Sequence, residues 1–265
     1  MLLEVLSDHP GAAVRRTEVM IKDQYRRIAE HGRAVAALQA QHAASRRWWQ
    51  LGKRLRQYQE VRELRARTPV ADTQAEHRLA QQAAGVAAED QMTIALQPLS
   101  DDWLLFRGYA NRRGEVDHLL VGPGGIWAIE VKGRGVCVHV DGDQWHYEKF
   151  DRYGNLVGQG VLEDRGGRSW GRQVSEIAGD LQTFLMSRGV NVTVRTAVVV
   201  IHDRASLGAF RNSSITVVSI GTDYLFDCIR SESMALDANI CTKVARLIRR
   251  DHVFHAERRV PRRPR

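Results

Sequence analysis

Apolar residues recur at helical spacing in the first part of the chain, and beyond Pro98 they alternate with polar residues as in strands. From Val14 to Arg67 there is no proline, and Ala, Arg, Gln, Glu and Leu dominate, so a long helix is expected. Its apolar residues follow a 4-3-4-3 spacing, which is interrupted and restarts at Leu51. This interruption favours a helical arm over a long coiled coil.

A second helix and a series of strands are expected next. Thr68-Pro69 marks a break, and residues 72–96 have helical periodicity. The segments 122–125 and 141–143 have tight-turn sequences, so each should join two antiparallel strands. The expected strands are residues 103–106, 116–121, 126–131, 136–140 and 145–150.

The rest of the chain predicts helices and buried strands in alternation. Residues 151–168 are rich in Gly, Asp and Arg, and a loop is expected there. The elements expected afterwards are a helix from Ser169 to about Arg188, strands at 193–201 and 215–220, and helices near 223–230 and 236–250. This order predicts an α/β fold, in which helices flank a mixed central β-sheet and a long N-terminal helical arm precedes it.

Charge is distributed unevenly along the 265 residues. The net charge is +8, yet residues 15–67 hold 14 Lys or Arg against 5 Asp or Glu, and residues 246–265 hold 8 against 2. Basic flanks around a mildly acidic middle are typical of contact with nucleic acid or with an anionic membrane surface, although a solvated helix face has the same composition. DNA is therefore an expected partner of the arm and the tail. No run of about 18 apolar residues is present, so no transmembrane segment is expected.

Aromatic residues lie among the cations of the arm. The sequence Arg46-Arg47-Trp48-Trp49 is followed by Lys53-Arg54. Such a patch could lie on lipid headgroups or stack on bases, but adjacent tryptophans more often dock a helix against its neighbour. Self-association of the helical residues 15–67 is a further expectation.

The cysteines and the N-terminus bear on the cellular compartment. Cys137, Cys228 and Cys241 are odd in number, far apart and without finger spacing, which argues against a disulfide framework and a structural zinc site. Glu4 and Asp8 interrupt the first residues, and no basic segment precedes an apolar core, so a secretory signal is not expected. A reducing cytoplasm is the expected location.

Three charged residues are expected on one face of two adjacent strands. Glu130 and Lys132 are two positions apart, so they project to the same side, and the glycine turn brings Asp117 onto the neighbouring strand. Grouped carboxylates are costly inside a fold unless they hold a hard divalent cation such as Mg²⁺. The corresponding chemistry is phosphodiester hydrolysis, with the lysine steering a water or stabilising charge. A surface salt bridge between Glu130 and Lys132 is the simpler alternative.

The motifs around these residues resemble the NERD (nuclease-related) domain of the PD-(D/E)xK nuclease superfamily, over about residues 76–200. The matching segments are Gly85-Val-Ala-Ala-Glu89, Glu115-Val-Asp-His118, Gly124-Gly-Ile126, Ile129-Glu-Val-Lys132 and Arg172-Gln173. Glu115-Val116 stands where the superfamily has a proline before its first aspartate, and the basic arm lies outside the resemblance.

The resemblance implies a restriction-endonuclease-like core with a Mg²⁺ or Mn²⁺ site. Asp117, Glu130 and the backbone carbonyl of Val131 would hold the metal. Glu89 matches the helical acidic position that completes such sites, and Gln173 matches a glutamine that supports them in some branches.

Two functions from different classes therefore compete. The first is a metal-dependent nuclease-like protein that hydrolyses DNA phosphodiester bonds through Asp117, Glu130, Lys132, Glu89 and Gln173. The second is a catalytically silent module that binds nucleic acid or a protein partner and is tethered by the arm. The expected domains are a basic helical arm at 1–68, a nuclease-related domain at 69–250 and a basic, disordered tail at 251–265.

Overall fold

The computed structural model describes residues 1–45, 51–164, 166–232 and 236–259. The chain divides into two compact units: residues 1–9 together with 84–265, and residues 10–83. Residues 1–9 belong to the larger unit because they add a strand to its sheet, and the expected domain boundary at residue 68 stays a prediction.

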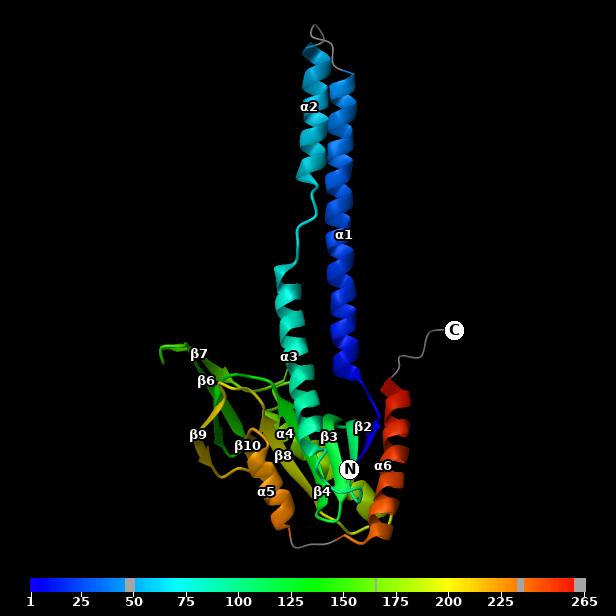
Figure 1. Ribbon diagram of the computed structural model, residues 1–265, viewed down its shortest axis with the longest axis vertical. Helices are drawn as coiled ribbons and strands as arrows, with labels where there is room; N and C mark the ends of the chain where they lie inside the picture. The colour runs from blue at the N-terminus through cyan, green and yellow to red at the C-terminus, as the bar shows by residue number, and fades with distance from the viewer. Residues whose placement is uncertain (46–50, 165, 233–235, 260–265) are drawn as a thin grey trace. The chain divides into compact units, whose positions relative to one another are not determined.

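A six-stranded mixed sheet forms the centre of the larger unit (Figure 1). Its order is β1-β2-β3-β4-β8-β10, with β2, β3 and β4 antiparallel in turn and β8 and β10 parallel to β4. The strands are β1 (Leu2–Val5), β2 (Leu104–Asn111), β3 (Gly114–Gly122), β4 (Gly125–Lys132), β8 (Val194–Val200) and β10 (Val217–Ile220).

A second sheet follows β4 directly along the chain. Its order is β7-β6-β5-β9, antiparallel except for the parallel pair β5 and β9. The strands are β5 (Cys137–Asp141), β6 (Gln144–Phe150), β7 (Leu156–Val161) and β9 (Ser206–Arg211).

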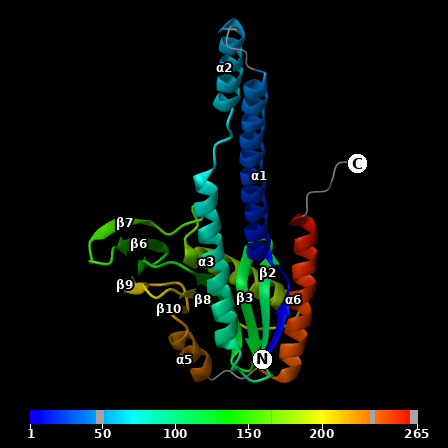
Figure 2. The ribbon, with the colours of Figure 1, turned by 45° about the horizontal axis from the view of Figure 1, so that its top comes forward.

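Helices cover both faces of the six-stranded sheet. On one face, α4 (Trp170–Ser187) and α6 (Ala238–Arg259) pack with the inner face of the second sheet into one apolar core. On the other face, the part of α3 (Thr73–Leu96) that begins at Ala84 and α5 (Asp223–Ser231) bury a second core (Figure 2). The expected mixed α/β fold with flanking helices is thus confirmed.

The smaller unit contains α1 (His9–Ala44) apart from its first residue, α2 (Leu51–Ala66) and the start of α3. His42 of α1 pairs with Glu60 of α2 at 3.1 Å, and Gln57 donates a hydrogen bond to Ser45 at 3.0 Å. Leu51 and Tyr58 are exposed, so self-association of the arm remains a prediction.

The long helix expected over 14–67 is two helices. Arg46-Arg47-Trp48-Trp49 lies outside the described residues, so its predicted role in docking the helix stays a prediction. Among the described helices, none has the length and apolarity needed to cross a membrane.

Most expected elements are confirmed, including both hairpins, but three strands and a helix extension were not expected. β1 and β9 lie at sheet edges and are largely exposed, and β7 falls in the expected loop, where two glycines interrupt its alternation.

The expected disorder from residue 251 is wrong as far as Arg259, because α6 continues to that residue. Tertiary contacts hold the extension: Tyr109 donates to Asp251 at 2.6 Å, and the Ala110 amide donates to His252 at 3.2 Å.

Candidate functional site

The antiparallel strands β3 and β4 separate at the site where the carboxylates gather. Their pairing runs from the glycine turn as far as His118 opposite Ile129, whereas β4 continues beside β8 to Lys132. Asp117 comes directly before His118, so it lies just outside the part of β3 that pairs with β4. Its Oδ2 accepts the Val131 amide hydrogen at 2.7 Å. The aspartate side chain thus replaces a backbone partner of β4, which holds its carboxylate beside the end of that strand.

Glu130 and Lys132 share one side of β4. The Lys132 ammonium donates to Glu130 Oε1 at 2.6 Å and lies 5.6 Å from the centre of the Trp170 ring, the first residue of α4. Glu130 is only 6% exposed, and its Oε2 is buried without a hydrogen-bond partner among the described residues. One oxygen of Glu130 is therefore paired with the lysine, and the other can serve as a ligand.

Glu89 of α3 reaches the same region from the opposite side of the sheet. Its Oε2 lies 3.6 Å from the Arg107 guanidinium, which also binds the neighbouring Asp90 at 2.8 Å. The close approach of α3 depends on Gly133, directly after β4, because a Cβ there would lie 2.6 Å from the backbone oxygen of Ala84.

Substitution of Gly133 by alanine should destabilise the larger unit by about 1–3 kcal/mol, since overpacking against backbone forces a shift of α3 or of the chain after β4. Chemical denaturation followed by circular dichroism would measure this change. Gly85→Ala on α3 is the matched control, because a Cβ there meets nothing within 4 Å, and it should be neutral or stabilising. Equal stability of the two variants would contradict the close approach.

Burial and neighbouring charge change the pKa of Asp117, Glu89 and Lys132. Burial, followed by the charge of Glu130, raises the pKa of Asp117 well above its usual value. Burial raises the pKa of Glu89 to about 7, although Arg107 opposes that shift. Burial alone would lower the pKa of the Lys132 ammonium, but the Glu130 and Asp117 carboxylates outweigh it and raise that pKa above its usual value. Such crowding of acids around one cation is costly, and a divalent cation would relieve it.

The residues present fit a hard divalent cation. Asp117 and Glu130 supply carboxylate oxygens, and the buried Oε2 of Glu130 lacks a partner among the described residues. The Val131 carbonyl points to the same side of β4 as the Val131 amide, toward Asp117, while the Lys132 carbonyl accepts a hydrogen bond from Ile201 after β8. All of these ligands are oxygens, which Mg²⁺ and Mn²⁺ prefer.

Two further residues lie apart from the carboxylates. Gln173, in the first turn of α4, donates to the Arg168 carbonyl at 3.0 Å and makes no direct hydrogen bond to Asp117, Glu130 or Lys132 within the described chain. His118 faces α3, where its Nε2 lies 2.8 Å from Thr93 Oγ1, and burial lowers its pKa to about 3. His118 is therefore a neutral core residue.

Sequence analysis missed Arg107 and Trp170 at the site. Arg107 is the pairing partner of His118 on β2, and Trp170 follows the helix cap Ser169. Arginine within an otherwise apolar strand was the available signal for the first. The approach of Trp170 to Lys132 depends on helix placement, for which the sequence carries no local signal.

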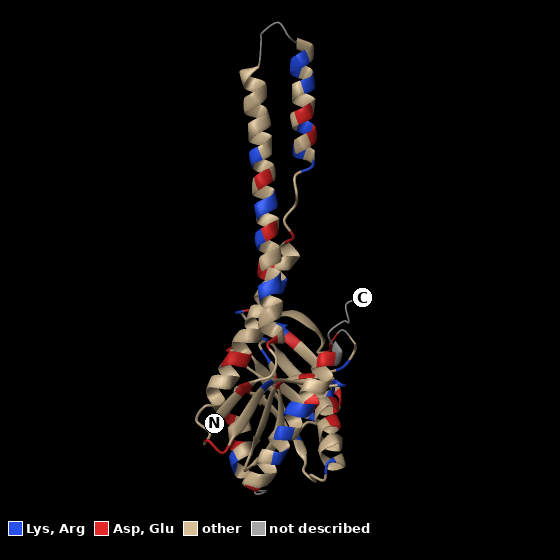
Figure 3. Ribbon diagram, turned by 90° about the vertical axis from the view of Figure 1, so that its right-hand side faces the viewer, with Lys and Arg blue, Asp and Glu red and all other residues tan. Residues whose placement is uncertain are grey.

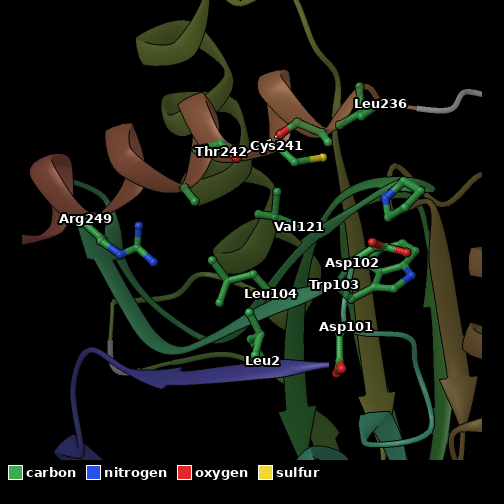
Figure 4. A pocket seen from close by; sticks show the side chains of 13 residues that line it. Leu2, Asp101, Asp102, Trp103, Leu104, Val121, Leu236, Cys241, Thr242 and Arg249 are labelled. Atoms are coloured by element: carbon green, nitrogen blue, oxygen red, sulfur yellow. Dashed lines mark hydrogen bonds between the residues drawn. The ribbon is translucent and has the colours of Figure 1, made fainter.

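A pocket of about 500 Å³ lies elsewhere, between the β1–β2 edge of the sheet and α6 (Figure 4). Trp103, Leu104, Cys241 and Arg249 are among its lining residues, and none of the expected site residues borders it. Its mostly apolar lining offers no grouping of acids comparable to that around Glu130.

Comparison with known proteins agrees with the geometry. Residues 84–201 match the family model of the nuclease-related domain, NERD. Neither the curated proteins nor the solved structures contain a match to the chain. The matched segment includes Glu89, Asp117, Glu130 and Lys132, together with the strands and helices that carry them. The similarity is to a family that belongs to the PD-(D/E)xK nuclease superfamily, and it covers somewhat less than half of the chain.

Proposed function

We propose that the protein hydrolyses phosphodiester bonds of DNA with Mg²⁺ or Mn²⁺ held by Asp117, Glu130 and the Val131 carbonyl. The single observation that carries the proposal is the grouping of two carboxylates and one ammonium where β3 and β4 separate, with Glu130 buried and Asp117 and Lys132 partly buried. A module that only binds a partner has no need of a buried glutamate oxygen that lacks a hydrogen bond within the described part of the chain.

The metal would supply an electrophile for a phosphate oxygen and a lowered pKa for a water. The chain's own contribution is positional. Asp117 is held by the Val131 amide, so its carboxylate is directed before substrate arrives. Lys132, between Glu130 and the Trp170 ring, presents a cation where negative charge develops on the phosphate. Glu89 remains a candidate ligand, and Gln173 could support the site only indirectly through the start of α4.

The basic arm is the proposed contact to the DNA backbone. Figure 3 shows Lys and Arg interspersed with Asp and Glu along the helices of the smaller unit. Many of these cations are exposed, among them Lys53, Arg54 and Arg56 of α2. Exposed cations of this kind bind phosphates and release counterions.

Neutralising Lys53, Arg54 and Arg56 to glutamine should weaken DNA binding and reduce the slope of log affinity against log salt by up to about 3, since about one counterion is released per phosphate contact. Fluorescence anisotropy at several salt concentrations would measure the slope. Glu63→Gln in the same helix is the control and should not reduce it. An unchanged slope in the triple variant would exclude a phosphate contact by this part of the arm.

The direct test of the proposed function is incubation of the purified chain with plasmid and linear DNA in Mg²⁺, Mn²⁺ or EDTA. Cleavage that requires metal, and that disappears in Asp117→Asn purified in parallel, would support the nuclease. If the wild type binds DNA but never cleaves it, the silent binding module would be the correct function.

A further inference from the structure

A second group of metal-ligating side chains lies on the outer face of the smaller sheet. Cys137 and His139 are two positions apart on β5, and Glu148 lies on β6 directly opposite Cys137. One ligand atom from each of the three lies within 4.8 Å of the other two. We propose that Cys137, His139 and Glu148 form a Zn²⁺ site, separate from the Asp117 and Glu130 carboxylates and independent of whether the protein is a nuclease.

The ligand types select the metal. A thiolate, an imidazole and a carboxylate together suit Zn²⁺, whereas Mg²⁺ prefers oxygen ligands alone. Three protein ligands leave a fourth position for water, and a pocket of about 450 Å³ beside His139, His146 and Glu148 opens the group to solvent. Binding would release the proton of the Cys137 thiol.

The local backbone is shaped around His139. The pairing of β5 with β9 is regular at Val138 and again at Val140, but β9 has two residues, Gly208 and Ala209, opposite the single residue His139. The extra residue lets the Ala209 amide donate to His139 Nδ1 at 3.1 Å. A Cβ on Gly208 would lie 2.4 Å from the His139 imidazole and 3.0 Å from Cys137 Sγ. Only glycine therefore leaves room for the thiol and the ring to lie next to each other beside the bulge.

The hydrogen bonds of His139 determine what metal binding must change. Because Nδ1 accepts the Ala209 amide hydrogen, Nε2 of the neutral ring carries the proton and donates it to Glu148 Oε2 at 3.2 Å. Coordination through Nε2 moves that proton to Nδ1 and ends the bond from Ala209. Ala209 is exposed on an edge strand, so water can accept its amide hydrogen. The cost is two hydrogen bonds, the one from Ala209 and the one from Nε2 to Glu148, which is small beside typical zinc-binding energies.

The test uses the full chain, stripped of metal with EDTA and then dialysed. Co²⁺ replaces Zn²⁺ as the spectroscopic probe, because a thiolate bound to Co²⁺ gives a near-ultraviolet charge-transfer absorption that carboxylate ligands do not give. We expect one equivalent of Co²⁺ to produce this absorption, and Zn²⁺ to displace it with a dissociation constant of about 1 μM or lower. The absorption should persist in Asp117→Asn, because that variant alters only the carboxylate site.

The variants assign the absorption to one group. Cys137→Ser should abolish it, while Cys228→Ser and Cys241→Ser, which replace similarly buried thiols, should retain it. Glu148→Gln changes a half-exposed side chain and should weaken Zn²⁺ binding about tenfold or more without unfolding the sheet. Absence of the absorption from the wild type, or its persistence in Cys137→Ser, would overturn the site. The wild-type result alone is decisive if a variant fails to fold.

Discussion

Replacement of Lys132 by alanine should reduce metal-dependent DNA cleavage by about 100-fold or more, the loss expected when one preorganised charge-stabilising group is removed. The ammonium is held between Glu130 and the Trp170 ring, so it is fixed before substrate binds. Single-turnover cleavage at saturating protein would measure the chemical step. Divalent metal binding should persist, and could tighten, because a like charge leaves the neighbourhood of the cation.

Controls separate a catalytic role from a loss of binding or folding. Lys149→Ala removes an exposed lysine of β6 and should leave cleavage unchanged. Lys132→Arg should restore little activity, because the guanidinium is larger and does not fit the same hydrogen bond to Glu130. DNA affinity measured in Ca²⁺ should change by no more than one phosphate contact. Equal single-turnover rates for the wild type and Lys132→Ala would exclude the assigned role of the lysine.

Local sequence signals were sufficient for the part of the site that lies on one hairpin. Successive side chains of a strand point to opposite faces, so Glu130 and Lys132 could be placed side by side on β4 from their spacing of two. The glycine-rich turn fixes the pairing of β3 with β4, which brings Asp117 next to that pair. Both inferences depend on a period of two and on a short turn, which are encoded within a few residues.

Contacts between distant segments could not be predicted in the same way. The hydrogen bond from Val131 to Asp117 exists because β3 and β4 part at His118, and no residue type marks that point. The position of Glu89 depends on how closely α3 approaches Gly133, which is a packing distance and not a pattern. β1 was missed because four edge residues, three of them exposed, have too little alternation to distinguish them from a loop.

The proposed zinc site could be predicted from the sequence only in part. Asp141-Gly142-Asp143 correctly predicts the hairpin of β5 and β6, and the observed pairing of Asp141 with Gln144 places Cys137 opposite Glu148. Spacing rules for zinc fingers look for ligands along the sequence, so they overlook ligands that meet across a hairpin. The bulge in β9 that brings Ala209 to His139 is a tertiary feature, and only the structure reveals it.

Asp117→Asn and Glu130→Gln should each weaken Mn²⁺ binding by about tenfold or more, because each replaces a charged hard ligand with a neutral amide oxygen. The asparagine oxygen can still accept the Val131 amide hydrogen, so the end of β4 should keep its geometry and the loss reports the missing charge. Glu130→Gln removes a buried charge whose second oxygen lacks a hydrogen bond among the described residues, and the folded state should tolerate it.

Isothermal titration calorimetry with Mn²⁺ would measure both affinities, in a Cys137→Ser background that removes the proposed zinc site. Asp90→Asn is the matched control, since this exposed acid binds Arg107 next to Glu89 but does not join the buried group. Its Mn²⁺ affinity should stay within about twofold of the background, because an exposed ion pair contributes little to the site. If both Asp117→Asn and Glu130→Gln bound Mn²⁺ as tightly as the control, the metal would have to be held elsewhere, and the nuclease mechanism built on these two carboxylates would fail with it.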